Sequence, residues 1–399
     1  IMAAFSTTII RRASLPLLLY LLIAFVRKVL QSRKGWKLIH GANDRRMARI
    51  KRRLPKGFGA YPSKLVTPLL PVFLNGWLNM FYVMFLKRVI VSTFRREEIW
   101  RPDGGVISVD WLQGHGQDAL PEDAPLLLVL TTITGKSSDH SLWLRAAADR
   151  GYRVAVFHRR GHDLPLKTPR FNIMGCADDA HAQVLHATSK FRNARFVAMA
   201  GISAGSGLLI TYLGRYAEET PVQAACCLCP AYEMNIWAML DQKYPRVASH
   251  MLDAVRNQWV RGNSDLLYTH DTKAAKAVER ATSLSKFVEA HAPFTGDGDY
   301  SAWLVRSNPM CHFQKVKVPT FILNALDDPV SLAENIPREE LFLDLSNYLL
   351  LKTPHGSHVA YNDGFLGTRS FMMDRSLDFL ETARSILLEQ EEDHDDDER

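Results

Sequence analysis

The sequence predicts a mixed α/β fold built on a mostly parallel, doubly wound sheet. Short apolar runs typical of buried strands alternate with helix-like stretches along most of the chain. The pentapeptide Gly201-Ile-Ser-Ala-Gly205 lies between one such run and a helix-like stretch, as in a tight strand-to-helix turn. Residues 231–318 contain no comparable strand, which predicts a helical cap inserted between two strands.

The bulk composition predicts one large folded domain with charged ends. The chain has 399 residues, of which 47% are hydrophobic and 23% charged, as in ordered globular proteins. We predict a hydrophobic anchor with a basic linker in 1–56, the folded domain in 57–388 and an acidic tail in 389–399. The formal net charge is +7, but the basic residues gather in 27–56 and the acidic residues in 389–398. Such an acidic block is expected to be solvated.

The uncharged, leucine-rich run 13–26 predicts contact with a membrane. It is short for a full span, so a signal anchor or an interfacial helix fits it better, with a cleaved signal peptide as the alternative. More basic residues follow the run than precede it, which predicts a cytoplasmic domain on the endoplasmic reticulum or another intracellular membrane. Residues 65–86 are also uncharged, but Pro68 and Pro71 interrupt them. We expect this stretch to belong to the folded domain or to rest on the membrane.

The sheet is predicted to begin with a hairpin around the turn Pro102-Asp-Gly-Gly105, between strands 97–100 and 106–111. Helix-like stretches such as 139–150 and 206–218 separate most of the later strands, which favours parallel pairing. These later strands are expected at 126–130, 153–157, 196–199, 222–228, 320–324 and 348–351.

Two patterns that resemble cofactor or metal sites are better explained otherwise. Cys226, Cys227 and Cys229 fall in or just after an apolar strand without a second ligand pair nearby, so we expect them to pack in the core. Gly135-Lys136-Ser137 superficially matches a phosphate-binding loop, but Leu130 stands where that motif requires glycine. The sequence therefore predicts no metal and no cofactor.

Ser203, at the centre of the pentapeptide, is the predicted nucleophile. A serine hydroxyl needs a base and an orienting acid, each placed after a later strand of the sheet. Asp327-Asp328 follows the strand 320–324, and His355-Gly-Ser-His358 follows the strand 348–351. We predict His358 as the base and Asp328 as the acid, with His355 and Asp327 as alternatives. Taken singly, each of these aspartates and histidines is explained as a turn or loop residue. Their order after Ser203, each following a strand, predicts acyl-transfer chemistry.

Acyl transfer also requires two backbone donors for the developing oxyanion. One is expected to be the N–H of Ala204, the residue after the nucleophile. The other is expected in the loop Ile133-Thr-Gly135, which follows the strand 126–130, with Thr134 as the predicted donor.

Several segments resemble a known family: Arg101-Pro-Asp-Gly-Gly-Val-Ile-Ser-Val-Asp-Trp111, Gly151-Tyr-Arg-Val-Ala-Val-Phe157, Arg160-Gly161, Gly201-Ile-Ser-Ala-Gly205, Asn324-Ala-Leu-Asp-Asp-Pro329 and His355-Gly-Ser-His358. From about Tyr61 onward the sequence is similar to membrane-anchored α/β-hydrolases related to plant embryogenesis-associated hydrolases, yeast medium-chain ethyl ester synthases and animal lipid hydrolases. The resemblance implies an α/β-hydrolase fold and a Ser203, Asp328, His358 triad. It also implies ester chemistry on acylglycerols, phospholipids or medium-chain acyl esters at an intracellular membrane.

The sequence thus predicts a membrane-associated serine hydrolase that cleaves lipid esters through an acyl-enzyme on Ser203. The expected partners are a lipid or acyl ester substrate and a membrane, without nucleic acid or metal. An alternative is an acyltransferase that passes the acyl group to an alcohol. His158 and Asp163 match an H-x4-D spacing known from acyltransferases, although a basic loop explains them better. A silent membrane adaptor, recruited through the charged ends, is the third hypothesis.

Overall fold

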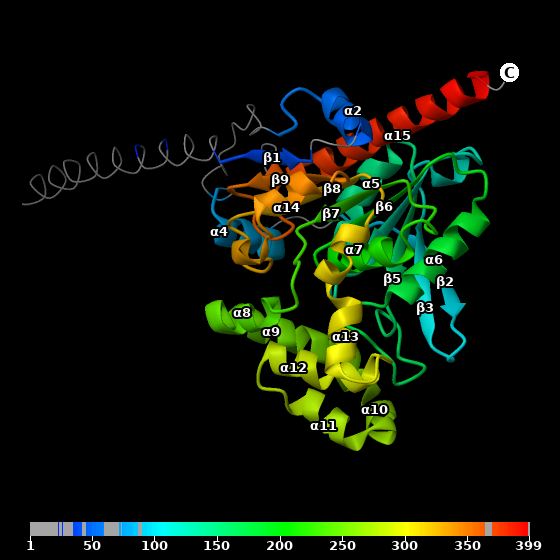
Figure 1. Ribbon diagram of the computed structural model, residues 1–399. Helices are drawn as coiled ribbons and strands as arrows, with labels where there is room; N and C mark the ends of the chain where they lie inside the picture. Colours follow the sequence, from blue (N-terminus) through cyan, green and yellow to red (C-terminus); the bar gives the residue numbers. More distant parts are fainter. Residues whose placement is uncertain are drawn as a thin grey trace, which may run out of the picture.

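The computed structural model describes residues 35–41, 45–59, 74–86, 90–363 and 369–397, together with residues 23, 26 and 72. A nine-stranded sheet with the order β1-β9-β8-β7-β6-β4-β5-β3-β2 forms its centre (Figure 1). A separate two-stranded ladder joins β10 (Asn362–Asp363) to β11 (Arg369–Ser370). The strands of the large sheet are β1 (Lys37–His40), β2 (Phe94–Trp100), β3 (Val106–Leu112), β4 (Leu126–Leu130), β5 (Arg153–His158), β6 (Val197–Ile202), β7 (Ala224–Leu228), β8 (Thr320–Ala325) and β9 (Tyr348–Thr353).

The strands from β9 to β5 in this order run parallel. At one edge β3 and β2 are antiparallel, and at the other edge β1 is antiparallel to β9. All five residues of β4 are buried, because helices cover both faces of the sheet. The mostly parallel sheet, the opening hairpin and each later strand predicted from the sequence are confirmed.

Helices form a layer on each face of the sheet. On one face residues of α2, α5 and α15 form a buried cluster that also contains Leu127 and Val129 of β4. On the other face residues of α6, α7 and α14 form a buried cluster that also contains Leu126 and Leu128, because successive side chains of a strand point to opposite faces. These helices are α2 (Arg45–Arg53), α5 (Ser141–Ala148), α6 (Ala177–Lys190), α7 (Ala204–Tyr216), α14 (Glu339–Asp344) and α15 (Phe371–Asp397).

Between β7 and β8 the chain leaves the sheet and forms a helical cap, in the region predicted as an insertion. The cap has its own core, which contains Trp259, Phe287 and Trp303, each fully buried. Figure 1 shows this cap on the opposite side of the sheet from α2 and α15. Its helices are α8 (Ile236–Lys243), α9 (Pro245–Val255), α10 (Ser264–His270), α11 (Thr272–Arg280), α12 (Leu284–Ala290) and α13 (Tyr300–Ser307).

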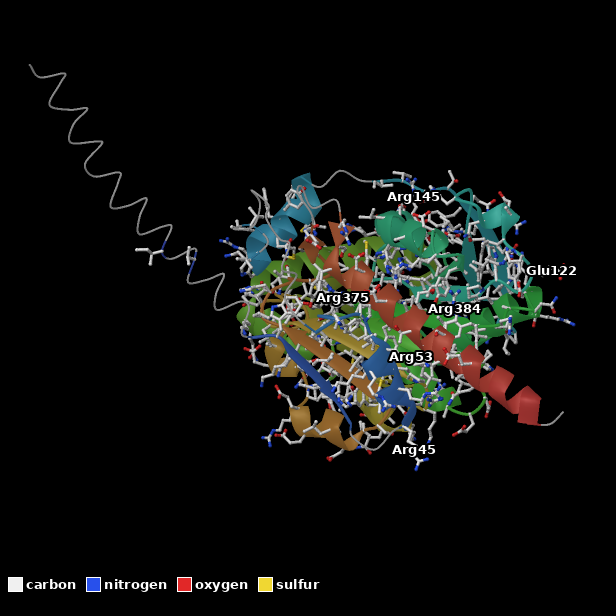
Figure 2. The ribbon with its side chains drawn as sticks, turned by 90° about the horizontal axis from the view of Figure 1, so that it is seen from above. Arg45, Arg53, Glu122, Arg145, Arg375 and Arg384 are labelled. Atoms are coloured by element: carbon white, nitrogen blue, oxygen red, sulfur yellow. The ribbon has the colours of Figure 1, made fainter. Side chains whose placement is uncertain are left out.

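The basic segment before residue 57, predicted as a linker, contributes β1 and α2 to the folded domain. Leu38 of β1 pairs with Leu351 of β9, and α2 buries Met47 and Ile50 completely. Figure 2 shows α2 beside α15. Arg53 of α2 donates a hydrogen bond to Glu389 of α15. The predicted boundary at residue 57 therefore lies too late in the chain. Two apolar residues among many basic ones are a weak signal, although their spacing of three fits one buried helix face.

The acidic segment 389–399 begins as part of α15, which continues to Asp397. Glu389 lies 3.7 Å from the guanidinium of Arg49 and also pairs with Arg53, both on α2. The start of the predicted tail is therefore a helical surface that faces basic residues of the N-terminal segment.

No helix within the described residues is both long and apolar enough to cross a membrane. The predicted anchor, 13–26, lies outside the described residues except for residues 23 and 26. Of the second uncharged stretch, 65–86, the structure describes residue 72 and residues 74–86. These form α4 (Gly76–Phe81), which continues directly into a turn of π-helix, η1 (Tyr82–Leu86).

Candidate active site

Ser203 lies between β6 and α7, in the tight turn predicted from the pentapeptide. Its φ of 55° is rare for a residue other than glycine. The turn is held from both sides, because Ser203 N–H donates to the Leu228 carbonyl at 2.8 Å and the Ser203 carbonyl accepts from Ser206 N–H at 2.8 Å. The hydroxyl therefore lies at the carboxyl end of the parallel strands, beside the N-terminus of α7.

The two glycines of the pentapeptide are required by close backbone contacts. A Cβ at Gly201 would lie 2.4 Å from the Gly205 carbonyl oxygen, and a Cβ at Gly205 would lie 2.2 Å from the Leu130 carbonyl oxygen. Neither contact can relax without moving backbone. The glycines thus let α7 approach β4 and β6 closely enough to form the strained turn.

His358 connects Ser203 to Asp328 through hydrogen bonds. Its Nε2 lies 2.8 Å from the Ser203 Oγ, and its Nδ1 lies 2.9 Å from the Asp328 Oδ2. The Asp328 side chain is fully buried, and its Oδ1 accepts from the N–H groups of Val330 at 2.7 Å and Ser331 at 2.8 Å. This fixed carboxylate favours the tautomer with a proton on Nδ1, which leaves Nε2 to accept from the serine.

The alternative pair, His355 and Asp327, lies beside this arrangement, and neither side chain is hydrogen-bonded to Ser203. The His355 Nδ1 is 3.4 Å from the Asp327 Oδ2. The Asp327 Oδ1 accepts from the N–H of Ser357 at 2.8 Å, and Ser357 has a φ of 57°. Asp327 therefore holds the loop that carries His358 in an unusual backbone conformation.

Helix α4 supports the same loop, which the sequence did not predict. The Ser357 hydroxyl donates to the Gly76 carbonyl at 2.6 Å, and the Asn79 side-chain amide donates to the Gly356 carbonyl at 3.4 Å. A Cβ at Gly76 would lie 2.2 Å from the Asp327 carbonyl oxygen, so glycine is required for this approach. The inner face of α4 is accordingly small and polar, since Asn79 is only 1% exposed.

A mostly apolar pocket opens beside Ser203, between the sheet and the cap. Cap helices α8 and α9 form one wall, with Trp237, Leu240 and Met251, and the loop after β4 contributes Ile133. The remaining lining residues are Met174, Ala204, Ala231, Met234, Ile236, Val330 and Ser331. An apolar cavity that ends at a hydrogen-bonded serine suits a hydrophobic group attached to a reacting carbonyl.

Comparisons with known proteins agree with this architecture. No protein-family model matches the chain. The embryogenesis-associated protein EMB8 of Picea glauca is 27% identical over 349 residues, which cover 79% of this chain and 74% of the relative. Phospholipase ABHD3 of Mus musculus is 29% identical over 301 residues, which cover 71% of this chain and 70% of the relative. The abhydrolase domain-containing protein 2 of Drosophila melanogaster is 25% identical over 287 residues, which cover 66% of this chain and 70% of the relative.

The chain has the α/β-hydrolase fold and is similar to proteins with an α/β-hydrolase domain. Among solved structures, a bacterial heroin esterase overlaps with a TM-score of 0.47 at 15% identity, covering 86% of this chain and 97% of that chain. In the α/β-hydrolase domain described above, the chain order of Ser203, Asp328 and His358 and their positions after β6, β8 and β9 follow the arrangement of this fold.

In this α/β-hydrolase domain the loop after β4 lies against the nucleophile turn. Ile133 lines the pocket together with Ser203 and Ala204, whereas Thr134, the predicted donor, is not among the described residues that line it. Arg159, just beyond β5, donates to the carbonyls of Thr131 and Thr132 at 3.1 Å each. These two bonds fix the peptide units that precede Ile133.

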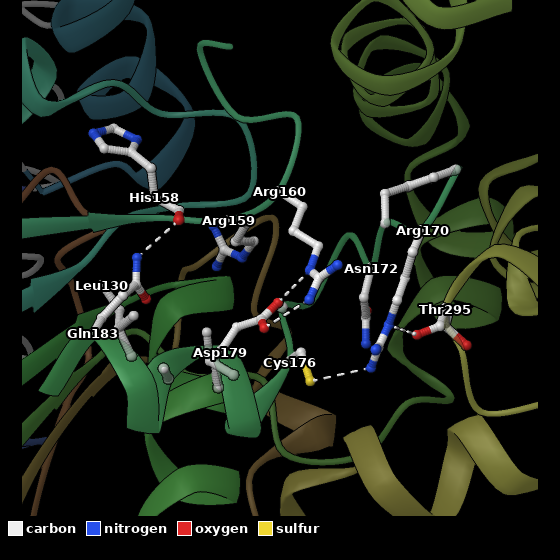
Figure 3. A pocket seen from close by; sticks show the side chains of 14 residues that line it. Leu130, His158, Arg159, Arg160, Arg170, Asn172, Cys176, Asp179, Gln183 and Thr295 are labelled. Carbon is white, nitrogen blue, oxygen red and sulfur yellow. Dashed lines mark hydrogen bonds and ion pairs between the residues drawn. The ribbon is translucent and has the colours of Figure 1, made fainter. Parts of the chain in front are cut away.

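The charge of Arg159 is buried without compensation by a carboxylate. The residue is 7% exposed, its Nε has no hydrogen-bond partner, and no ion pair within the described part of the chain includes it. Burial lowers the pKa of Arg159 to about 10, which leaves the guanidinium protonated at neutral pH. Figure 3 shows it in a pocket next to Arg160, whose guanidinium is instead paired with Asp179. Sequence reasoning missed Arg159, because its role depends on contacts with a distant loop.

In the α/β-hydrolase domain, His158 and Asp163 of the H-x4-D motif pair with other residues and not with each other. His158 is fully buried, and its Nε2 lies 3.0 Å from the Asp110 Oδ2 and 2.7 Å from the Ser137 Oγ. Burial opposes the ionisation of Asp110, but hydrogen bonds from Arg96 and the other partners hold its pKa well below the usual range. Asp163 instead pairs with Arg96 at 3.1 Å and Lys136 at 3.2 Å on the surface. The motif residues therefore anchor the loops after β4 and β5.

The three cysteines in and just after β7 pack in the core of the α/β-hydrolase domain, as predicted. Cys226, Cys227 and Cys229 are fully buried, and burial raises the pKa of each thiol. Ligand atoms of Cys229, Asp328 and His358 lie within 4.8 Å of one another. Each already has a partner, since the Cys229 sulfur accepts from the Val359 N–H at 3.4 Å.

Proposed function

We propose that the protein is a membrane-associated serine hydrolase that cleaves carboxylic esters of lipids through an acyl-enzyme on Ser203. The observation that carries the proposal is the continuous hydrogen-bonded path from Asp328 through His358 to the Ser203 hydroxyl. The relatives named as phospholipases support ester cleavage, and the apolar run 13–26 supports association with a membrane.

In the proposed reaction, His358 Nε2 accepts the hydroxyl proton while Ser203 Oγ attacks the ester carbonyl. The backbone N–H of Ala204 and an N–H of the loop Ile133-Thr-Gly135, for which Thr134 is the predicted donor, stabilise the oxyanion. The protonated His358 then donates to the leaving alcohol, which departs and leaves the acyl group on Ser203. Water, activated by His358, releases the acid and restores the enzyme.

The apolar lining of the pocket predicts a preference for extended acyl chains. With the full-length protein, each added methylene of a p-nitrophenyl ester is expected to raise kcat/KM about three- to fourfold until the pocket is filled. Ala231→Phe, which adds volume to the wall, should shift the optimum toward shorter chains. A kcat/KM series from acetate to palmitate measures both effects. A maximum at acetate, or no turnover of any ester, would contradict the proposal.

The same acyl-enzyme could pass its acyl group to an alcohol, so the acceptor must be measured directly. With a primary alcohol supplied at increasing concentration, the partition of product between free acid and new ester separates hydrolysis from acyl transfer. Free acid as the main product supports the hydrolase, whereas ester formation that dominates at low alcohol concentration supports the acyltransferase alternative.

We further propose that Arg159 is a positioning residue for the oxyanion loop. A buried cation without a carboxylate partner is costly to keep, and its two bonds go to carbonyls of the loop that precedes Ile133. Holding these carbonyls orients the following N–H groups toward the oxyanion and places a positive charge nearby.

Arg159→Met is therefore expected to lower kcat about 10- to 100-fold at nearly unchanged KM, because the loss falls on the transition state. The affinity for an alkyl boronic acid, which mimics the tetrahedral intermediate, should fall by the same factor as kcat/KM. Arg153→Met is the matched control, since Arg153 also donates to backbone carbonyls, those of Leu120 and Pro121, away from the site. A loss of thermal stability with unchanged boronate affinity would assign Arg159 a structural role only.

A further inference from the structure

The segment formed by α4 and η1 carries its apolar residues on the outside. Trp77, Leu78, Phe81, Met84 and Phe85 are 45%, 49%, 52%, 52% and 67% exposed. Their spacing places them along one side of the helix, and we call them the apolar stripe. The opposite side contains Gly76 and Asn79, which are buried against the loop of His358. This arrangement reverses that of an ordinary surface helix, which buries its apolar face.

We propose that the apolar stripe is a docking surface for a lipid bilayer, which brings the mouth of the acyl pocket to the membrane. The inference deepens the proposed function, since it names the surface through which that same site meets its lipid substrate. Large aromatic and aliphatic side chains on one face of a short helix are typical of segments that lie in the interface plane of a membrane. Isolated exposed apolar residues need no explanation, but a continuous stripe does.

The position of the apolar stripe next to the pocket supports a lipid bilayer as its binding partner. The ring of Trp77 contacts the ring of Tyr244, with centroids 5.1 Å apart. Tyr244 lies between α8 and α9, whose residues Trp237 and Met251 line the pocket beside Ser203. An ester that leaves a bilayer held against the stripe would therefore meet the pocket wall without first crossing water.

The first continuous stretch of the described chain begins at Gly35, next to the loop on which α4 packs. A Cβ at Gly35 would lie 3.2 Å from Pro354, the neighbour of His355, and α4 packs on this same loop through Gly356. Only the basic segment 27–34 separates Gly35 from the uncharged run 13–26. The start of this described stretch, Gly35, which follows the run in the sequence, therefore lies at the loop on which α4 packs.

Charge also favours a lipid surface over an apolar protein partner. The stripe contains no acidic residue, and Lys87-Arg88 follows it directly in the sequence. Basic residues at the border of an apolar helix face attract lipid phosphates and anionic headgroups. In the sequence, the segments 27–34 and 87–88 carry positive charge without acidic residues.

Photocrosslinking of the full-length protein on phosphatidylcholine vesicles tests the contact directly. p-Benzoylphenylalanine replaces Phe85 or, as the control, Val305, which is 62% exposed on cap helix α13. Lipid adducts are expected at position 85 and not at position 305. Equal yields at both positions would overturn the proposal, as would adducts between two copies of the chain at position 85. This readout does not depend on enzymatic activity.

A kinetic comparison tests the consequence for the site. The double substitution Phe81→Glu with Phe85→Glu is expected to lower the hydrolysis of a long-chain ester embedded in vesicles about tenfold or more. Turnover of a soluble short-chain ester should remain unchanged, and Val305→Glu should affect neither reaction. Equal losses on both substrates would contradict docking. If the wild-type protein turns over neither ester, the proposed function fails, while the crosslinking result still decides the docking surface.

Discussion

Ser203→Ala is expected to remove ester hydrolysis almost entirely, with a loss of kcat on the order of 10⁴- to 10⁶-fold. The substitution removes only the Oγ, which is the proposed nucleophile, and with it the 2.8 Å hydrogen bond to His358. The turn itself should persist, because Ser203 is held by backbone bonds to Leu228 and Ser206. The variant should therefore fold as the wild type does.

Two measurements on the purified protein check this result. Covalent labelling by a fluorophosphonate should disappear in Ser203→Ala, and circular dichroism should show an unchanged thermal transition. Ser206→Ala is an informative comparison, because the Ser206 hydroxyl donates to the Gly201 carbonyl at 2.6 Å and is buried beneath the turn. The Ser206→Ala variant should be less stable than the wild type but should still be labelled by the fluorophosphonate. Labelling that persists in Ser203→Ala would exclude Ser203 as the nucleophile.

The second large effect is expected at His358 and Asp328. His358→Ala removes the base and should cost nearly as much as the loss of the serine, because the members of such a triad act as a unit. Asp328→Asn keeps the shape of the side chain but favours the wrong tautomer of His358, for which a loss of about 10⁴-fold in kcat is expected. Both losses should appear in kcat for a soluble ester, with a small change in KM.

His355 and Asp327 provide controls of the same residue types in the same two loops. His355→Ala removes a side chain that lies 3.4 Å from Asp327 and is not hydrogen-bonded to Ser203. Asp327→Asn retains an oxygen that can accept from the Ser357 N–H. Both variants should keep most of their activity and lose some stability. If His355→Ala were as inactive as His358→Ala, the assignment of the base would be wrong.

The strands and the nucleophile turn could be predicted because their signals are local. A buried parallel strand such as β4 needs an unbroken apolar run, and a turn at Ser203 needs glycines two residues to either side. The order of Ser203, Asp328 and His358, each after a strand, then predicts that the three meet at one edge of the sheet. Parallel strands bring their carboxyl ends together regardless of the residues between them.

The features that were missed depend on contacts between distant segments. β1 and α2 carry a short apolar signal among basic residues, and only pairing with β9 and packing on α15 makes them part of the domain. Arg159 resembles any basic loop residue until β5 places it beneath the loop after β4. The lining of the pocket by Ile133 likewise depends on how the loop after β4 folds against Ser203.

The sequence by itself determined the fold class, the nucleophile turn and the presence of two candidate acids and two candidate histidines. Local periodicity and turn chemistry suffice for these, because they depend on neighbouring residues. Only the tertiary structure decided which pair reaches Ser203, since adjacent residues in a loop point in different directions once Val330, Ser331 and Ser357 fix the backbone. It also turned α4 so that Asn79 faces the active-site loop and Phe85 faces outward, which a hydrophobicity pattern alone would have reversed.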